Sequence, residues 1–480
     1  MVPDPTAPPA WARPRRLPRV SCVTFASERP ETVMAPSRPL ALAAAVAVVA
    51  GFGAPHAALA QESAPAPDAP EVSSAVADLS QPATTAEDAR WNAARDALAA
   101  ASADDPFYLP PATVPATPGA LIRTEPTAFY LDPVRLVQVP AHATRIMYAS
   151  QDAQGRPIAV TGTVLTPTAP WTGGGERPVI SYAVGTQGAA DRCAPSRTLS
   201  TGVQYEGVGI TSLLSRGHAV VVTDYEGLGT PGTHTYMVRE AQAHAVLDAV
   251  RAAAQVSGSG VAATAPVALA GYSQGGGAAA AAAELAPDYA PELDLKGAYA
   301  GAPPADLVQV AGRIDGGLYA AFLLYAMAGQ LAAYDVDPAT HLNETGLTAL
   351  AGAAETCMVG SLAYAHLDSA TLTHTGQDFP ELVRSDAELA GILAEQRIGA
   401  PGRRPDVPVM IAHSVTDDVI PYRTGRDLGR RWCAEGARVR FDPLLTPTHV
   451  GGHVASLPRM GAFLDATLAD RWTADSCGWF

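Results

Sequence analysis

The sequence is poor in charge and almost without lysine. Its 480 residues include one lysine, Lys296, and only 16% are charged, against about 25% in an average globular domain. Acids outnumber bases, and the formal net charge is −15. Nucleic-acid binders need a basic face to meet phosphates, so this balance argues against a nucleic-acid partner. Hydrophobic residues make up 48%, the opposite of a disordered chain, and we expect a large buried core.

The N-terminal region lacks an apolar run long enough to cross a bilayer. The run Leu40–Phe52 is roughly 13 residues long, whereas a membrane-spanning helix needs about 20. This length is typical of a signal-peptide core, and Arg38 precedes the run. The small-x-small sequence at 58–60, Ala-Leu-Ala, then fits a cleavage site.

These features predict an exported protein. We expect that Met34 is the true start and that residues 1–60 are a leader and signal peptide, cleaved after Ala60. A membrane anchor is the alternative interpretation. Residues 61–104 follow as a loosely ordered N-terminal segment. The mature protein is then secreted and extracellular.

Cysteine spacing offers no metal site. Of five cysteines, Cys22 falls in the predicted leader, and no pair among the other four has C-x-x-C spacing, so metal binding is not expected. An even number of cysteines in an exported chain suggests two disulfides, for which the sequence alone allows three connectivities. The four are Cys193, Cys357, Cys433 and Cys477.

Short apolar segments alternate with helical ones, and no repeat of 20–50 residues is visible. This alternation predicts an α/β fold with a mostly parallel sheet covered on both faces. Residues 107–140 look irregular. The predicted strands are Arg145–Ser150, Ile158–Thr166, Pro178–Val184, Ala219–Thr223, Val267–Ala270, Lys296–Ala302, Val407–Ala412 and Arg438–Leu444, and the helices are Glu240–Val256, Gly275–Leu285 and Leu457–Leu468.

About a hundred residues interrupt this alternation without a convincing strand. We predict that 303–406 form a helical cap inserted between a first part of the core, 105–302, and a second part, 407–480. The cap contains the apolar stretch Leu318–Tyr334. A transmembrane helix is disfavoured there because the stretch lies between two strands of one sheet. A buried cap helix and the wall of an acyl-chain tunnel are the other interpretations, and the two can coexist.

The motif that carries chemistry is G-x-S-x-G at residues 271–275. Alone it is weak, but the strand Val267–Ala270 precedes it and a helix follows at once. Strand, sharp turn and helix together are the nucleophile elbow, which lifts the serine hydroxyl out of the sheet. The helix N-terminus aims free N–H groups at the site. Ser273 is the predicted nucleophile, and the N–H of Gln274 is a predicted oxyanion donor.

A serine hydroxyl needs a base, and in this fold an acid and then a histidine follow the nucleophile along the chain. The acid should follow the strand Val407–Ala412, where Asp417 is our choice and Asp418 the alternative. The histidine should follow the last strand. His449 and His453 both fit, and their local chemistry does not separate them.

The second oxyanion donor should come from the loop after the strand Pro178–Val184. Either Thr186 or Gln187 could supply its backbone N–H.

Several motifs together resemble one family. The chain is similar to the secretory lipases of fungi and actinobacteria, which are Candida antarctica lipase A-like α/β-hydrolases, over about residues 105–477. The matching features are Phe107-Tyr108-x-Pro110-Pro111, Tyr148-x-Ser150 with Gly155-Arg156-Pro157, Cys193-Ala194-Pro195-Ser196, Asp224-Tyr225-x-Gly227-x-Gly229, the run Gly271–Gly276, and Asp417-x-Val419-x-Pro421.

The resemblance implies an α/β-hydrolase core with a helical cap and secreted hydrolysis of triacylglycerols and simple esters. It favours His449, because the family's histidine precedes an apolar helix with a proline about nine residues on, as Pro458 stands here. It also implies the disulfides Cys193–Cys357 and Cys433–Cys477.

We therefore expect a serine ester hydrolase, a triacylglycerol lipase that works through an acyl-enzyme without metal or cofactor. Its partners are a small ester or lipid substrate and, transiently, a lipid interface, and the protein is a monomer. A short-chain carboxylesterase is the first alternative. A peptidase or acyltransferase with the same triad would prefer other acyl donors or acceptors, and a binding protein with a dead site would hydrolyse nothing.

Overall fold

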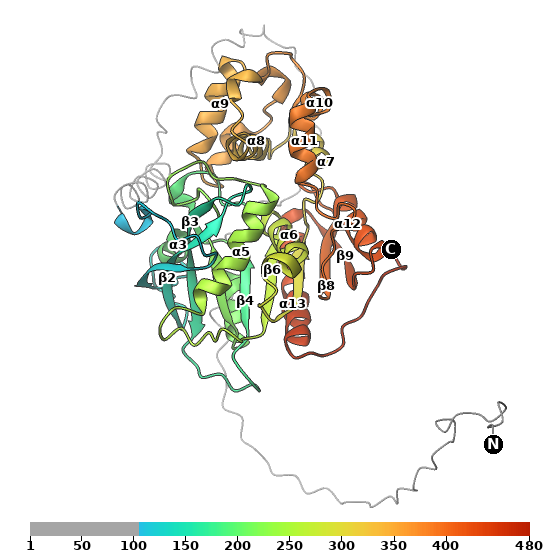
Figure 1. Cartoon of the computed structure of the whole chain (residues 1–480). Helices are drawn as coiled ribbons and strands as arrows, with labels where there is room; N and C mark the ends of the chain where they lie inside the picture. Colours follow the sequence, from blue (N-terminus) through green and yellow to red (C-terminus); the bar gives the residue numbers. More distant parts are fainter. Residues whose placement is uncertain (1–104) are drawn as a thin grey trace, which may run out of the picture. The chain divides into compact units, whose positions relative to one another are not determined.

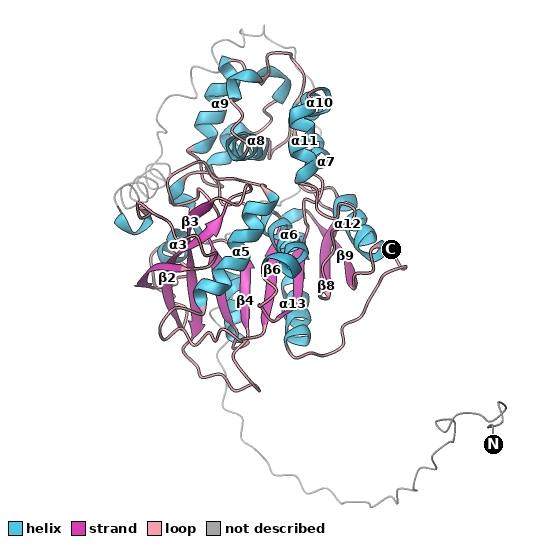
Figure 2. Cartoon of the chain, viewed as in Figure 1, coloured by secondary structure: helices cyan, strands magenta, loops and turns pink. Residues whose placement is uncertain are grey.

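One mixed nine-stranded sheet organises the computed structural model, which describes residues 105–480 (Figures 1 and 2). The predictions for the leader, 1–60, and for residues 61–104 lie outside the described residues. The strand order is β1-β2-β3-β5-β4-β6-β7-β8-β9, with β4 to β9 parallel and the first three antiparallel. The bounds are β1 Leu121–Thr127, β2 Ala141–Gln151, β3 Pro157–Pro167, β4 Val179–Ala183, β5 Ala219–Thr223, β6 Val267–Tyr272, β7 Leu295–Gly301, β8 Val409–Thr416 and β9 Val439–Pro447.

Helices cover both faces of this sheet, as the alternation of apolar segments predicts. On β4, Ser181 donates a hydrogen bond to the Val246 carbonyl of α5, whereas Tyr182 approaches Gly209 of α4. Neighbouring strand residues point to opposite faces, so α5 and α4 lie on opposite sides. A right-handed connection requires this, because the chain moves from β4 to β5 in one direction and returns to β6 in the other. These helices are α3 Pro195–Thr201, α4 Gly207–Ser215, α5 Arg239–Ala253, α6 Gln274–Tyr289, α12 Tyr422–Ala434 and α13 His449–Leu468.

The central strands are apolar along their whole length because both of their faces are covered. Every residue of β4, β5 and β6 is buried. This explains why these segments are continuous apolar runs, without the alternation expected for a sheet with one wet face.

Two predictions of local structure are wrong. Residues 107–140 are not irregular throughout, since they contain β1, whose half-exposed residues give a weak apolar signal. The closing helix begins at His449 and not at Leu457. Gly451 and Gly452 are poor helix formers and hide its first turn, while Thr448, at φ 64°, caps it by accepting the N–H of Gly451 at 3.1 Å.

Residues 302–408, between β7 and β8, contain helices and no strand. Figure 1 shows these helices gathered together beyond one end of the sheet. Their apolar side chains form a second hydrophobic cluster around Phe322 and Tyr325, separate from the core around the sheet. That these helices form a cap stays a prediction. The helices are α7 Leu307–Ile314, α8 Ala321–Ala333, α9 Glu344–Ala354, α10 Phe379–Ser385 and α11 Ala387–Glu395.

No helix in the described part of the chain combines the length and the apolar character that crossing a membrane requires. The apolar stretch Leu318–Tyr334 is largely α8, and most of its side chains are buried against the other helices of this segment.

Two disulfides are present, with the pairings that the resemblance implies. Cys193 pairs with Cys357, with 5.5 Å between their Cα atoms, and so joins the short turn of helix before α3 to the segment after α9. Cys433 of α12 pairs with Cys477 and holds the C-terminal segment against the core.

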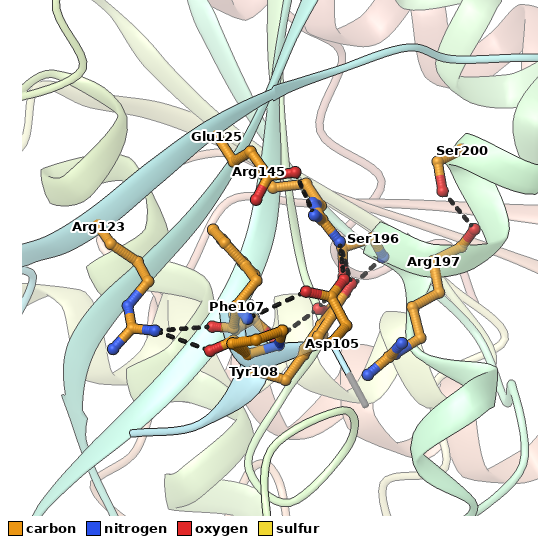
Figure 3. Close-up of polar contacts among 12 residues, drawn as sticks. Asp105, Phe107, Tyr108, Arg123, Glu125, Arg145, Ser196, Arg197 and Ser200 are labelled. Carbon is orange, nitrogen blue, oxygen red and sulfur yellow. Dashed lines mark hydrogen bonds and ion pairs between the residues drawn. The ribbon is translucent and has the colours of Figure 1, made fainter. Parts of the chain in front are cut away.

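Residues 105–108 are held against the core by contacts that we call the N-terminal clasp (Figure 3). Asp105 forms an ion pair of 2.7 Å with Arg145, whose guanidinium lies 4.5 Å from the centre of the Phe107 ring. Arg197 lies 3.6 Å over the ring of Tyr108. Such cation–aromatic contacts are worth about 0.5–2 kcal/mol each.

A buried polar network continues from the clasp to the end of β5. The Tyr108 hydroxyl lies 2.8 Å from the Ser196 hydroxyl, and Ser196 donates through both its N–H and its hydroxyl to Asp224. Burial raises the pKa of Asp224 to about 6, although its hydrogen bonds with Ser196 and Thr161 act in the opposite direction.

Candidate active site

The predicted elbow around Ser273 has the backbone that a strained turn requires. β6 ends at Tyr272, α6 begins at Gln274, and Ser273 between them adopts φ 60°, ψ −123°. Its N–H donates to the Gly301 carbonyl at 2.9 Å. A Cβ added to Gly275 would stand 1.9 Å from the Ala183 carbonyl oxygen, so only glycine permits this approach of helix and strand.

The elbow lies at the point where the direction of the strand order reverses. β4 pairs with both β5 and β6, and Ala183 is in register with Gly271. In open α/β sheets ligands bind outside the carboxyl ends of the strands at such a switch point. The loop after β4, with Thr186 and Gln187, therefore emerges beside Ser273.

Asp417 and His449 are in direct contact. The Asp417 side chain is fully buried, and its Oδ2 lies 2.7 Å from His449 Nδ1. Its other oxygen accepts the N–H groups of Val419 and Ile420 at 2.9 and 2.7 Å. Burial alone would raise the pKa of Asp417, but hydrogen bonds from His413 and His449 outweigh burial and hold it well below its usual range. The ionised carboxylate assigns the proton to Nδ1 of His449 and leaves Nε2 as the acceptor.

His449 is also fixed from the side of the elbow. The Tyr272 hydroxyl donates to the His449 carbonyl at 2.8 Å, and the two ring centres are 4.9 Å apart. His449 Nε2 is buried and meets no hydrogen-bond partner within residues 105–480. The base candidate thus packs on the residue that precedes Ser273.

The alternative acid and histidine occupy different places. Asp418 accepts the backbone N–H of His449 at 2.7 Å, so it contacts the main chain and not the ring. His453, one turn further along α13, packs its ring on Tyr272 with 4.7 Å between centres. Burial, with the neighbouring His449, lowers the pKa of His453 to about 4. Among the described contacts, His453 has none with either acid.

The loop after β4 is held by residues that sequence reasoning missed. Glu206 Oε1 accepts the Gly185 N–H at 2.5 Å, and the Tyr205 hydroxyl donates to the Thr186 carbonyl at 3.0 Å. Burial raises the pKa of Glu206 to about 7, although hydrogen bonds from Tyr182 and Gly185 act in the opposite direction. No local motif marks Glu206 or Tyr205, since both act across the fold.

A second support comes from the segment between β5 and α5. The Tyr236 hydroxyl lies 2.6 Å from Thr186 Oγ1, and His234 Nε2 lies 3.3 Å from Gln274 Nε2. His234 Nδ1 bonds the Glu226 carbonyl at 2.8 Å, and burial lowers the pKa of His234 to about 4. The neutral ring therefore donates through Nδ1, and its Nε2 accepts a hydrogen bond from the side-chain amide of Gln274. This segment therefore contacts both Thr186, in the loop after β4, and Gln274, which follows Ser273.

An apolar cavity opens at Ser273 and extends among α7, α8, α10 and α11. Apart from Ser273, Tyr236 and Gln330, only apolar side chains line it. They are Met237, Leu307, Val308, Val310, Ala311, Ile314, Phe322, Leu323, Ala326, Met327, Leu331, Phe379, Pro380, Val383, Leu389, Leu393, Val419 and Ile420. In residues 105–480, no group of three or more histidine, cysteine or acidic side chains is placed to hold a metal ion.

Comparison with known proteins identifies relatives across most of the chain. A family model described as secretory lipase matches residues 193–476. A probable inactive lipase from Mycobacterium tuberculosis is 30% identical over 377 residues, which cover 74% of this chain and 80% of the relative. A secreted triacylglycerol lipase from Malassezia globosa is 28% identical over 394 residues, with 78% and 81% covered.

Solved structures agree with the predicted α/β-hydrolase fold. Candida antarctica lipase A in its closed state has a TM-score of 0.70 at 25% identity, covering 78% of this chain and 88% of the other. A rice cell wall degrading esterase from Xanthomonas oryzae has a TM-score of 0.60 at 19% identity, covering 74% and 100%, a likeness of fold alone.

Proposed function

The chain belongs to the secretory lipase family, and on that premise we propose that it is a secreted triacylglycerol lipase that acts through Ser273, Asp417 and His449. The observation that carries the proposal is the pairing of a strained serine elbow with a buried Asp417–His449 hydrogen bond at the same edge of the sheet. This is the arrangement of groups that serine acyl transfer needs.

The proposed reaction has two halves. His449 Nε2 takes the proton of Ser273 as the hydroxyl oxygen attacks the ester carbonyl, and the same proton then passes to the leaving alcohol. Water, deprotonated by His449, attacks the acyl-enzyme; the bond to Ser273 breaks, His449 returns the proton to the serine oxygen, and the fatty acid is released. Asp417 keeps His449 in the tautomer with Nδ1 protonated and stabilises the imidazolium.

The N–H of Gln274 and that of Thr186 or Gln187 form the proposed oxyanion hole. Gln274 is the first residue of α6, where N–H groups have no partner within the helix. Within residues 105–480 none of these three N–H groups donates a hydrogen bond to a protein atom. Preorganised donors of this kind are worth about 10²–10³ in rate.

The cavity supports a long-chain acyl substrate. Ser273 is part of its lining, and most of the other lining side chains are apolar residues of the segment 303–406. An acyl chain bound there would leave water while its ester carbonyl stays at the serine. On this basis the segment 303–406 is the cap, and α8 is both a buried helix and a wall of the acyl site.

Secretion and contact with lipid complete the proposal. The predicted leader, cleaved after Ala60, would export the chain to an oxidising compartment in which its two disulfides persist. Exposed apolar side chains on α4 and α13, among them Val208, Val450 and Val454, support transient contact with a lipid interface. The Mycobacterium tuberculosis relative is described as a probable inactive lipase. A protein that binds lipid but does not hydrolyse it is therefore the alternative.

A chain-length series with a serine control tests the proposal. The protein, exported from the full chain so that its disulfides form, is compared with Ser273→Ala on p-nitrophenyl esters from acetate to palmitate and on a triglyceride emulsion. We expect serine-dependent hydrolysis that reaches long chains and the emulsion. Activity confined to short esters would make the protein a carboxylesterase, preference for amides would make it a peptidase, and activity that is absent or survives Ser273→Ala would refute the site.

A further inference from the structure

A short segment of the cap is bonded to the loop that carries the proposed oxyanion donors. Met358 N–H donates to the Gln187 carbonyl at 2.8 Å, and Ala189 N–H donates to the Thr356 carbonyl at 2.9 Å. Between these bonds, Gly188 and Cys357 pair as an antiparallel bridge. We call Thr356–Met358 the bridging segment.

The bridging segment packs so closely on the loop after β4 that no side chain fits between their backbones. A Cβ added to Gly188, at φ 119°, would stand 2.3 Å from the Thr356 carbonyl oxygen and 2.5 Å from Cys357 Cα. Cys357 is also joined covalently to the core by its disulfide with Cys193. Glycine at 188 is therefore required both by its φ and by its neighbour.

The peptide planes that carry the donor N–H groups are held by contacts next to those of the bridging segment. Each N–H shares a rigid peptide plane with the carbonyl of the preceding residue, so fixing that carbonyl fixes the N–H. The Gly185 carbonyl, which orients Thr186 N–H, accepts Gln187 Nε2 at 3.0 Å. The Thr186 carbonyl, which orients Gln187 N–H, accepts the Tyr205 hydroxyl.

The loop is then held at both of its ends. Glu206 binds Gly185 from the core side, and Met358 binds Gln187 from the cap side. Without the cap contact, the Gln187 carbonyl would lose its partner, and Gln187 would be held from one side only, by the bond of the Tyr205 hydroxyl to the Thr186 carbonyl.

We propose that the bridging segment is a fixed part of the oxyanion-hole framework and that the Cys193–Cys357 disulfide is its positioning bond. The proposal deepens the proposed function and rests on it. It divides the cap in two: α7, α10 and α11, which line the cavity, can move without the site losing its donors, whereas Thr356–Met358 stays with the core.

The second disulfide provides a matched control. We compare Cys193→Ala/Cys357→Ala with Cys433→Ala/Cys477→Ala, using a soluble short ester at a temperature well below the Tm of both variants. A fluorophosphonate probe counts reactive Ser273 sites at its labelling end point, so kcat is expressed per folded site. We expect kcat to fall about 10-fold or more in the first variant, because loss of one donor costs about 10²–10³, with KM within about threefold. The second should keep kcat within about twofold.

An oxyanion mimic separates positioning from general stability. A trifluoromethyl ketone forms an anionic adduct with the serine, and its inhibition constant should rise in parallel with the loss of kcat/KM only in the variant without the Cys193–Cys357 bond. In the Cys433→Ala/Cys477→Ala background, dithiothreitol should reproduce the loss and reoxidation should reverse it. An unchanged kcat and inhibition constant would overturn the proposal.

Two further measurements test the same contact without removing a disulfide. Gly188→Ala keeps both disulfides and should lower kcat. Gly174→Ala should not, because a Cβ added at that position would meet open space. Equal effects on kcat in the two variants would overturn the proposal. Amide hydrogen exchange needs no activity: Ala189 and Met358 should exchange as slowly as the core, and fast exchange there would refute a fixed segment. Absence of ester hydrolysis in the wild type would instead refute the proposed function.

Discussion

Asp418 accepts the backbone N–H of His449 at 2.7 Å, while its neighbour Asp417 accepts the ring N–H of the same residue at the same distance. Two adjacent acids thus hold one histidine by different parts. Asp418 fixes the first residue of α13, and Asp417 fixes the orientation and tautomer of the ring. The two carboxylates therefore have different consequences when they are replaced.

Asparagine at each acid tests this division. Asp417→Asn presents an amide to Nδ1 and favours the wrong tautomer, so we expect kcat to fall about 10³–10⁴-fold. Asp418→Asn keeps an acceptor oxygen for the backbone N–H and should cost about 10-fold or less. Steady-state kinetics on a soluble ester, corrected for active sites by fluorophosphonate titration, gives both values. Equal losses would contradict the assignment.

The two histidines of α13 are separated by a similar comparison. His449→Ala removes the proposed base and should lower kcat by at least about 10³-fold. His453→Ala removes a ring that only packs on Tyr272, so kcat should stay within about 10-fold and the main effect should be on Tm. A larger loss of kcat in His453→Ala would exchange the roles of the two residues.

Glu206 predicts how stability depends on pH. Its pKa in the folded protein is about 7, above its usual value of 4.5, so the folded protein keeps a proton that the unfolded chain releases. Its contribution to stability therefore falls as pH rises from 4.5 to about 7. Glu206→Gln cannot titrate, and its free energy of unfolding relative to wild type should rise across this window by up to about 3 kcal/mol. Denaturant unfolding at several pH values measures this difference, and a constant difference would contradict it.

The cavity predicts a steric change in substrate preference. Ala326 lies in the cavity wall on α8, so Ala326→Phe should fill the space that a long acyl chain needs. We expect kcat/KM to fall for palmitate esters by about 10-fold or more and to change little for acetate. Ala351→Phe, on an exposed position of α9, is the control. If both variants keep the wild-type chain-length profile, the cavity is not the acyl site.

The elbow could be predicted because its chemistry is local. Gly271, Ser273 and Gly275 are close in sequence, and the strand and helix around them are strongly apolar or helix-forming. His449 and His453 could not be separated from residue type, because the distinguishing contact is with Asp417, on another strand connection. The resemblance to a family, and not the local sequence, favoured His449.

The supporting residues were missed for a related reason. Glu206 contacts Gly185, and Met358 contacts Gln187, only after the sheet and the helical segment between β7 and β8 have assembled. A lone glutamate before a helix and a methionine in a loop carry no pattern of their own. The start of α13 was also missed, because two glycines outweigh a threonine cap in any estimate from propensity.

The N-terminal clasp sets a limit on trimming by peptidases. A cut after Tyr108 would remove Asp105 and both aromatic rings, leaving Arg145 and Arg197 without their cation–aromatic contacts. Water would then reach Ser196 and the buried carboxylate of Asp224 at the end of β5. If peptidases trim the chain from its N-terminus, a cut that passes Asp105 therefore exposes polar groups that residues 105–108 keep away from water.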